Sequence, residues 1–411
     1  RFYYSLRVAI FTPFFAAGSE LDSGIGVHFR DLALGLKENG KNVVVFHVPY
    51  ETSTSKFWSF EGIAIHSIGL KTPRIPKIKG IGTLCRITSF FDFFEVSQLF
   101  LKTKLSFYKA HSLNSFDIIE ASSNRGVAFG ASTLKNRPPI FTRVSTLMKQ
   151  VFENQTNNAD LDYRLTAKFE EKQIQNSEYL VTHTHKHANE VSKILNFNPK
   201  RFKIIPHGIC VEQINHEKTT NSSTKDVIKV LFVGRLEQRK GFDTLIQSIP
   251  EVIKKYQKIH FDICGTGEML TKAKSELSES ALLNVSFHGY LPREKLDYFY
   301  SNCDIFVAPS RYESFGIIYL EAMNFSKPIV ACKTGGTPEV VLDGLSGILI
   351  EPNNSDQLSH ALLKLINNQK LRERMGNNGK KYLLNKFSIN TLIDLTAEHY
   401  RQGISNKFPE F

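Results

Sequence analysis

The chain has 411 residues, of which 41% are hydrophobic and 22% charged, a composition typical of globular proteins that excludes a disordered chain. Its 52 lysines and arginines exceed its 40 acidic residues, and the resulting net charge of +12 favours anionic partners such as phosphate-bearing small molecules or an acidic membrane surface. Because the sequence holds no RNA-binding, zinc-finger or bZIP pattern, we do not expect it to bind nucleic acid. Its length predicts two domains.

Apolar runs alternate with helical patterns through the first half of the chain. Residues 6–11 form the first run, and a glycine-bearing stretch, a helical pattern at residues 27–37 and a second run at 43–46 follow it. Further strand-like runs lie at residues 63–65, 117–120, 140–144, 179–182 and 203–205. This alternation predicts a parallel sheet with helices on both faces.

A second alternating series follows a break at PHG and a polar stretch at residues 212–225. Its apolar runs lie at residues 229–233, 259–264, 284–287, 304–308, 328–331 and 347–350. We therefore predict two doubly wound, Rossmann-like α/β domains, residues 1–208 and 209–385, with a helical segment at 386–411 that packs back on the first domain. Because doubly wound sheets bind ligands at the carboxyl ends of their strands, we expect a cleft between the domains.

The five cysteines are Cys85, Cys210, Cys264, Cys303 and Cys332, and they form no CxxC pair. This pattern favours a reducing, cytosolic compartment. No apolar run is long enough for a transmembrane helix, and we interpret the N-terminus as a first strand rather than a signal peptide.

Cationic residues follow the first strand of the second series, in GRLEQRKG at residues 234–241. Arg235 and Lys240 would lie at the mouth of the cleft, in a loop that leads into a helix, and fixed cations in that position suit a diphosphate. A solvated basic loop is the alternative.

Two acids lie eight positions apart in RYESFGIIYLEAM, after the strand-like DIFVAPS. If a helix begins near Phe315, Glu313 lies in the loop before it and Glu321 about two turns along it. Carboxylates accept hydrogen bonds from vicinal hydroxyls, so one acid could hold a sugar ring and the other a ribose. Alternatively, Glu313 is a helix N-terminal charge and Glu321 a partner for a lysine.

Adjacent glycines Gly335 and Gly336 follow a strand in KTGGTPEVVLDGLSG. Glycines in such a loop let backbone N–H groups approach an anion closely. A tight loop without a ligand is the alternative.

These segments, together with CGTGE, GYLPREKL and KIIPHGI, follow one another as in the GT-B glycosyltransferases of family 4, and SGIGVHFRDLALGLKENG extends the resemblance to the N-terminal half. The resemblance implies a metal-independent enzyme that retains the anomeric configuration. It implies that Arg235 and Lys240 stabilise the donor diphosphate, that Glu313 contacts the transferred sugar and that Glu321 holds the ribose. It adds Gly24, Gly26, Gly265, Leu291, Gly335 and Gly336 as donor-binding residues.

One position departs from the family pattern. Where many relatives have a histidine that meets the transferred sugar, this sequence has Ser145, next to Arg143. Serine donates a hydrogen bond but carries no proton at neutral pH as histidine does. We retain Ser145, Arg143 and His28, near the glycine loop, as candidate contacts for donor or acceptor.

Several other signals carry alternative interpretations. Asp160 and Asp162 form a DxD without a preceding strand, and His183, His185 and His187 would share one side of a continuing strand, but we expect no metal at either place. GIGVHF lacks the third glycine of a dinucleotide fingerprint. The basic loop at residues 71–79 and the aromatic stretch at 87–108 fit a solvated loop and a core helix better than a membrane-surface element.

The expected activity is transfer of a sugar from a UDP- or GDP-type donor to a glycan or lipid-linked acceptor, in cell-surface polysaccharide synthesis. We expect a cytoplasmic protein that could contact the inner face of a membrane. The alternatives are another enzyme with paired Rossmann-like domains, such as a sugar-nucleotide epimerase or a phosphorylase, and an inactive nucleotide-binding scaffold.

Overall fold

The computed structural model describes residues 5–16, 24–49, 54–70, 82–153, 161–211 and 227–407. The chain forms two compact units, Arg1–Pro206 with Ile389–Phe411, and His207–Ser388. The sequence predicted these boundaries at 208/209 and 385/386. They lie at 206/207 and 388/389 because Ile209 forms a parallel bridge with Ser388, which joins the two ends of the second unit.

The first unit, called unit 1, contains an eight-stranded sheet with the order β3-β4-β2-β1-β5-β6-β7-β8. Every neighbouring pair is parallel except β3 with β4. The strands are β1 (Arg7–Thr12), β2 (Asn42–His47), β3 (Lys56–Phe60), β4 (Ile63–Ser67), β5 (Ile118–Ser122), β6 (Ile140–Arg143), β7 (Tyr179–Thr182) and β8 (Phe202–Ile204).

The antiparallel strand β3 is absent from the sequence prediction. It forms a hairpin with β4 through Glu61 and Gly62, which both have positive φ (49° and 71°). Such a two-residue turn requires left-handed backbone at both positions, and the Glu-Gly pair is a weaker signal for it than Asn-Gly.

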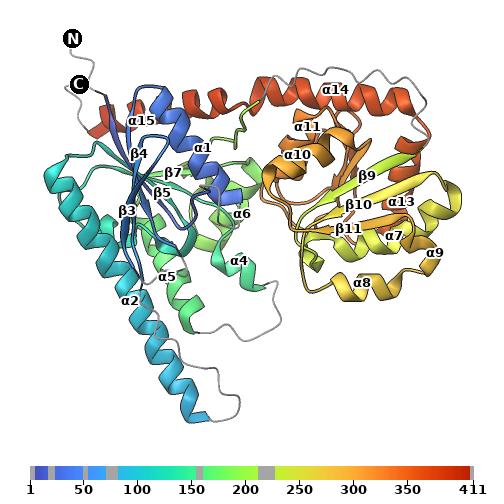
Figure 1. Cartoon of the computed structure of the whole chain (residues 1–411). Helices are drawn as coiled ribbons and strands as arrows, with labels where there is room; N and C mark the ends of the chain where they lie inside the picture. The colour runs from blue at the N-terminus through green and yellow to red at the C-terminus, as the bar shows by residue number, and fades with distance from the viewer. Residues whose placement is uncertain are drawn as a thin grey trace. The chain divides into compact units, whose positions relative to one another are not determined.

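Helices cover both faces of this sheet (Figure 1). Val8 and Ile10 of β1 pack with α1 and α15 on one face, whereas Ala9 and Phe11 pack with α2 on the other, as the two-residue period of a strand requires. The helices are α1 (Gly24–Glu38), α2 (Gly82–Leu113), α3 (Phe129–Ser132), α4 (Met148–Glu153), α5 (Leu161–Asn176), α6 (His185–Leu195) and α15 (Ile389–Lys407), with 3₁₀ turns η1 (Asn124–Gly126) and η2 (Pro199–Arg201).

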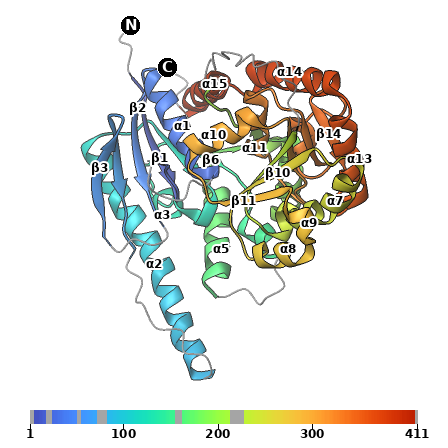
Figure 2. The same cartoon turned by 45° about the vertical axis from the view of Figure 1, so that its right-hand side comes forward.

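Helix α15 returns the end of the chain to unit 1 and lies beside α1 in Figures 1 and 2. Its residues Ile393 and Tyr400 belong to the same buried cluster as Leu32 of α1. The C-terminal segment is therefore part of the core of unit 1.

Helix α2 holds the aromatic stretch singled out in the sequence. Val96, Leu99 and Phe107 are buried, and Leu99 and Phe107 pack with strand residues of the sheet, while Leu101 and Leu105 are exposed. Earlier side chains of the helix, including Phe90, Phe91, Phe93 and Phe94, and the basic loop at 71–79 lie outside the described residues. None of the helices in the described ranges has the length and apolar character needed to cross a membrane.

The second unit, called unit 2, contains a six-stranded, wholly parallel sheet with the order β11-β10-β9-β12-β13-β14. The strands are β9 (Ile228–Val233), β10 (Ile259–Cys264), β11 (Val285–Gly289), β12 (Ile305–Ala308), β13 (Ile329–Cys332) and β14 (Gly347–Ile350). All six coincide with predicted apolar runs to within two residues at either end, because a doubly covered parallel strand is apolar along its whole length.

Both faces of this sheet are covered as well (Figure 2). Val230 and Phe232 of β9 pack with α7 and α13, and Leu231 packs with α10, α11 and α14. The helices are α7 (Phe242–Lys255), α8 (Leu270–Glu276), α9 (Glu279–Leu282), α10 (Arg293–Asn302), α11 (Ile317–Asn324), α12 (Thr337–Val340), α13 (Ser355–Ile366) and α14 (Gln369–Lys386), with the 3₁₀ turn η3 (Gln238–Lys240).

Candidate donor site at the carboxyl edge of unit 2

The central strands β9 and β12 are neighbours in the sheet of unit 2, although β10 and β11 lie between them in the chain. The strand order therefore reverses direction between β9 and β12, and the loops after these two strands diverge. In doubly wound sheets this switch point is the usual place for a ligand. The loop after β9 carries Arg235 and Lys240, and the loop after β12 carries Glu313.

Lys240 and Glu313 meet at this switch point. Lys240 Nζ lies 2.5 Å from Glu313 Oε1, and the Ser310 hydroxyl donates to the same oxygen at 3.1 Å. Burial by itself raises the pKa of the Glu313 carboxyl, but the charge and hydrogen bond of Lys240, aided by Arg239 and Ser310, hold that pKa below its ordinary value. Glu313 is thus a buried, ionised carboxylate with a lysine as its counter-ion.

Arg235 lies in the same loop but takes no part in that pair. Its side chain is 65% exposed, and its Nη2 lies 3.1 Å from Glu237 Oε1. Glu237 also contacts Arg239, at 3.2 Å. Arg235 therefore presents a solvent-accessible guanidinium beside the more buried Lys240.

Close backbone packing explains two of the glycines. A Cβ at Gly265 would lie 1.8 Å from the carbonyl oxygen of Gly234, and a Cβ at Gly335 would lie 2.1 Å from that of Glu313. Gly335 also has a φ of 52°. Only glycine fits at either position, so both hold the loops of the carboxyl edge against one another.

The anion-binding role expected for the Gly335–Gly336 backbone is only partly available. The N–H group of Gly336 donates to the carbonyl oxygen of Glu313 at 2.8 Å, so it supports the acid instead of facing a ligand. The following helix α12 spans only Thr337–Val340, which is too short to provide a strong helix dipole. The loop therefore helps to position Glu313 by a hydrogen bond to its backbone carbonyl.

Glu321 lies in α11, which begins at Ile317 rather than near Phe315. Gly316 has a φ of 86°, a left-handed conformation that stops the helix from starting earlier, so Glu321 is about one turn along the helix and not two. Its carboxylate is largely buried, and it receives a hydrogen bond from the Tyr300 hydroxyl at 2.7 Å and forms an ion pair with Arg293.

Arg293 and Tyr300 were missed by the sequence analysis. Both lie in α10, which starts directly after the loop that holds Leu291. Leu291 itself is partly buried and packs on the core of this face of the sheet. The motif GYLPREKL contains Arg293, but only the fold shows that this arginine faces Glu321.

In unit 1, the candidate residues lie around the start of α1. The helix begins at Gly24, and the carbonyl of Gly26 accepts a hydrogen bond from the N–H group of Ala16 at 3.4 Å. His28 is buried, and burial, followed by the charges of Arg143 and His183, lowers its pKa well below the usual value. His28 is therefore neutral at physiological pH.

Arg143 is turned into the core of unit 1. Its Nε lies 2.7 Å from Glu120 Oε1, and its Nη2 donates to the Thr396 hydroxyl at 2.7 Å. The Tyr400 hydroxyl donates to the other oxygen of Glu120 at 2.6 Å. Arg143 thus joins β5, β6 and α15, and this placement disfavours a direct contact with donor or acceptor.

Ser145 follows β6, and its hydroxyl oxygen is buried without a hydrogen-bond partner among the described residues. It is the one candidate of this loop with an unused polar atom. A hydroxyl in this state is able to donate to or accept from a bound hydroxyl group.

The strand does not continue through the three alternating histidines, so they do not share one strand side. Strand β7 ends at Thr182, and Thr184 caps α6, so His185 is an exposed first residue of that helix. His183 and His187 stack with ring centroids 4.9 Å apart, and the Thr182 hydroxyl bonds to His187 Nδ1 at 2.6 Å. Within the described residues no group of three metal-ligating side chains gathers. Asp160 lies outside those residues, as does the side chain of Asp162.

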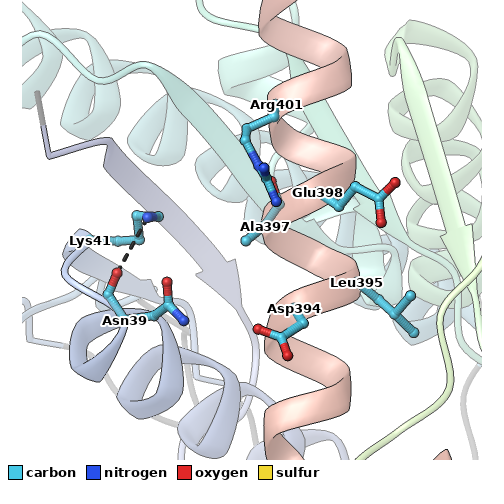
Figure 3. Close-up of a pocket in the computed structure, with 7 residues that line it drawn as sticks. All are labelled: Asn39, Lys41, Asp394, Leu395, Ala397, Glu398 and Arg401. Atoms are coloured by element: carbon cyan, nitrogen blue, oxygen red, sulfur yellow. Dashed lines mark hydrogen bonds between the residues drawn. The ribbon is translucent and has the colours of Figure 1, made fainter. Parts of the chain in front are cut away.

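A surface hollow of about 450 Å³ lies elsewhere on unit 1 (Figure 3). Asn39 and Lys41 line it from the loop between α1 and β2, and Asp394, Glu398 and Arg401 line it from α15. Lys41 directly precedes β2, so the hollow lies at the amino ends of the strands, where doubly wound sheets do not bind their ligands.

Comparison with known proteins agrees with the geometry of unit 2. Residues 213–382 match the family model described as glycosyl transferases group 1. The matched residues lie within unit 2, which is therefore similar to the members of this family. The match includes Arg235, Lys240, Glu313 and Glu321, so the candidate site lies wholly within the matched part of the chain.

Curated proteins are similar to parts of this chain. An uncharacterized glycosyltransferase of Methanocaldococcus jannaschii is 36% identical over 37% of this chain and 42% of its own length. O-antigen chain mannosyltransferase C of Escherichia coli is 28% identical over 50% of this chain and 55% of its own length. The chain spans about half the length of the curated relatives it matches.

Solved structures show the fold of both units together. Sucrose-phosphate synthase from Thermosynechococcus elongatus has a TM-score of 0.77 at 17% identity, and the likeness covers 98% of this chain and 100% of that one. Anabaena HepE, solved in complex with UDP and glucose, has a TM-score of 0.68 at 16% identity, with 96% and 99% covered. The chain therefore has the GT-B fold of two Rossmann-like units.

Proposed function

We propose that the protein is a retaining glycosyltransferase that moves a sugar from a UDP- or GDP-type donor to a hydroxyl group of a glycan or lipid-linked acceptor. The ion pair of Lys240 with Glu313 is the observation that carries this proposal, and it lies at the switch point of unit 2, within the residues that match the family model. It places a partly buried cation beside a buried anion, at the switch point where doubly wound sheets bind ligands.

The reaction needs positive charge at the leaving group. When the bond from the anomeric carbon to the diphosphate breaks, its electron pair leaves with the diphosphate, the acceptor oxygen bonds to the carbon, and the acceptor proton passes to the departing phosphate. Lys240 and the exposed Arg235 lie in one loop and together would stabilise the charge that grows on the diphosphate.

The two acids have separate roles in the proposal. Glu313 accepts hydrogen bonds from hydroxyls of the transferred sugar, and its contact with Lys240 keeps it ionised for that purpose. Glu321 accepts hydrogen bonds from the ribose. Its largely buried carboxylate lies on α11, further along the chain than the loop that holds Glu313.

The relatives support a nucleotide-sugar donor and a polysaccharide setting. HepE is described in complex with UDP and glucose, and the Escherichia coli relative is described as an O-antigen chain mannosyltransferase. We propose the same classes for this chain: a nucleoside diphosphate sugar as donor and a cell-surface glycan or glycolipid as acceptor.

The proposal is tested with a panel of radiolabelled UDP- and GDP-sugars, each incubated with the protein and an acceptor extract. A transferase releases nucleoside diphosphate and moves the label into a glycan or lipid product. We expect Lys240→Ala to depress mainly turnover and Glu321→Ala to weaken mainly donor binding.

Each rival function gives another result. An epimerase would convert the sugar while it stays attached to the nucleotide, and a phosphorylase would release a sugar phosphate. A scaffold would bind nucleotide but release no diphosphate with any donor and extract. Unchanged kinetics in both Lys240→Ala and Glu321→Ala would remove the proposed site even if transfer occurs.

A further inference from the structure

The carboxylate of Glu321 is held by two donors from one helix. Arg293, the first residue of α10, forms an ion pair with Oε1, and the hydroxyl of Tyr300, two turns later in α10, donates to Oε2 at 2.7 Å. Neither donor was part of the motif pattern that pointed to Glu321. Together they fix both oxygens of the acid in one orientation.

We propose that Arg293, assisted by Tyr300, is a positioning residue for ribose recognition. Arg293 fixes the Glu321 carboxylate so that the remaining lone pairs of this carboxylate face the ribose hydroxyls. This inference rests on the proposed function of the site. A carboxylate has about four acceptor positions, and the two donors from α10 use one on each oxygen. One further position on each oxygen stays available, which suits two vicinal hydroxyls.

The charges of the three groups support this arrangement. A guanidinium stays protonated at all physiological pH values, and burial and the neighbouring Glu321 raise the pKa of Tyr300 well above its ordinary value, so both remain donors. An ionised carboxylate of this burial needs such partners, because an unpaired one would be costly.

Helix α10 is itself held in place, which makes it a firm support for Glu321. The Tyr300 ring is fully buried and stacks on Phe325 with centroids 5.8 Å apart, and Phe299 contacts the ring of His288 at 4.4 Å. Arg293 Nε also lies 3.3 Å from Asp297 Oδ1.

The position of Arg293 also joins two parts of the donor site. It follows the loop of Leu291 by two residues, and the family resemblance expects that loop to meet the nucleobase. Its guanidinium reaches Glu321 on α11. This ion pair therefore links the loop expected beside the base to the acid proposed beside the ribose.

The test compares binding of UDP with 2′-deoxy-UDP by isothermal titration calorimetry, or GDP with 2′-deoxy-GDP if the protein prefers guanine. In the unaltered protein we expect the ribonucleotide to bind at least about ten-fold more tightly than the deoxynucleotide. This is the typical effect of losing a hydrogen bond to a charged group. In Arg293→Ala we expect this ratio to fall toward one, because Glu321 loses its fixed orientation. Arg293→Lys restores part of the ratio, and Tyr300→Phe lowers it partly.

The exposed Arg374 of α14 provides a matched control, since Arg374→Ala removes an arginine far along the chain from the site and should leave the ratio unchanged. Thermal melting of each variant shows whether it is folded. If Arg293→Ala does not fold, the ratios of Arg293→Lys and Tyr300→Phe decide.

The outcomes separate this inference from the function on which it rests. If Arg293→Ala weakens both nucleotides equally and keeps the ratio, Arg293 has only a structural role and the inference is overturned. A ratio near one in the unaltered protein also overturns it, while transfer activity with the donor panel would still support the proposed function. If the unaltered protein binds neither nucleotide, the proposed donor site is contradicted, and the inference about Arg293 is contradicted as well.

Discussion

Lys240 and Glu313 lie 73 residues apart in the chain, yet Lys240 Nζ is 2.5 Å from Glu313 Oε1. The two residues that the sequence assigned to the diphosphate and to the transferred sugar are therefore each other's counter-ions. Under the proposed function, a donor that enters the site has to share or replace this contact.

The first prediction concerns the stability of that pair. Lys240→Ala leaves the carboxylate of Glu313 buried without its counter-ion, and we expect a loss of roughly 1–3 kcal/mol in the free energy of unfolding. Adding Glu313→Gln to Lys240→Ala should recover much of this loss, because the amide carries no charge. Thermal melting of the two single variants and the double variant measures the coupling energy between Lys240 and Glu313. Strictly additive effects on stability would contradict the prediction.

The second prediction concerns Gly335. In Gly335→Ala the new Cβ meets the carbonyl oxygen of Glu313, so the loop has to move and take Glu313 with it. We expect weaker nucleotide binding and a loss of stability above the roughly 1 kcal/mol that a left-handed alanine costs. Gly344→Ala is the matched control, because Gly344 has a φ of 73° but no atom near its Cβ position. Equal melting temperatures for the two variants would refute the close-packing explanation.

The third prediction concerns Arg143. Arg143→Ala leaves Glu120 buried beside Tyr400 without a cation, and we expect a loss of about 3–5 kcal/mol. Arg143→Met combined with Glu120→Gln should recover most of that stability. Nucleotide binding to the folded double variant should equal that of the unaltered protein. A double variant that is stable but unable to transfer sugar would instead assign Arg143 a role in substrate contact.

The fourth prediction concerns the pH dependence of unit 1. Burial, offset in part by hydrogen bonds from the Met148 N–H group and the Ser123 hydroxyl and reinforced by the charge of Glu171, raises the pKa of Glu170 from 4.5 to about 8. The folded state therefore keeps a proton that the unfolded state loses above pH 4.5, so stability falls as the pH rises from about 4.5 to about 8.

In Glu170→Gln this contribution disappears, since the amide has no proton to lose. Its oxygen can accept from the Met148 N–H group and its NH₂ group can donate to the Ser123 hydroxyl. Melting temperatures between pH 5 and pH 9 should fall less steeply in this variant than in the unaltered protein. Glu398→Gln, on the exposed side of α15, should keep the original slope, and a Glu170→Gln profile parallel to it would contradict the prediction.

The succession of parallel strands along the chain was determined by the sequence alone. Parallel strands covered on both faces are apolar along their length, so β10 and β14 were predicted to the residue. The positions of Arg235, Lys240 and Glu313 at strand ends followed from the same pattern, because the residues after a strand lie at the carboxyl edge whatever the rest of the chain does. The hairpin of β3 with β4 was not predicted, since its turn signal is weak.

Pairing of the charged side chains was decided only by the tertiary structure. Arg143 bonds to Thr396 across 253 residues, and Arg293 meets Glu321 across 28, and neither contact has a local signal. The N–H group of Gly336 turns to Glu313 for the same reason: the loops after β12 and β13 meet only when these strands are neighbours. Local sequence determines which residues reach the carboxyl edge, but strand order and helix packing determine which of them touch, because those contacts depend on parts of the chain that are distant in sequence.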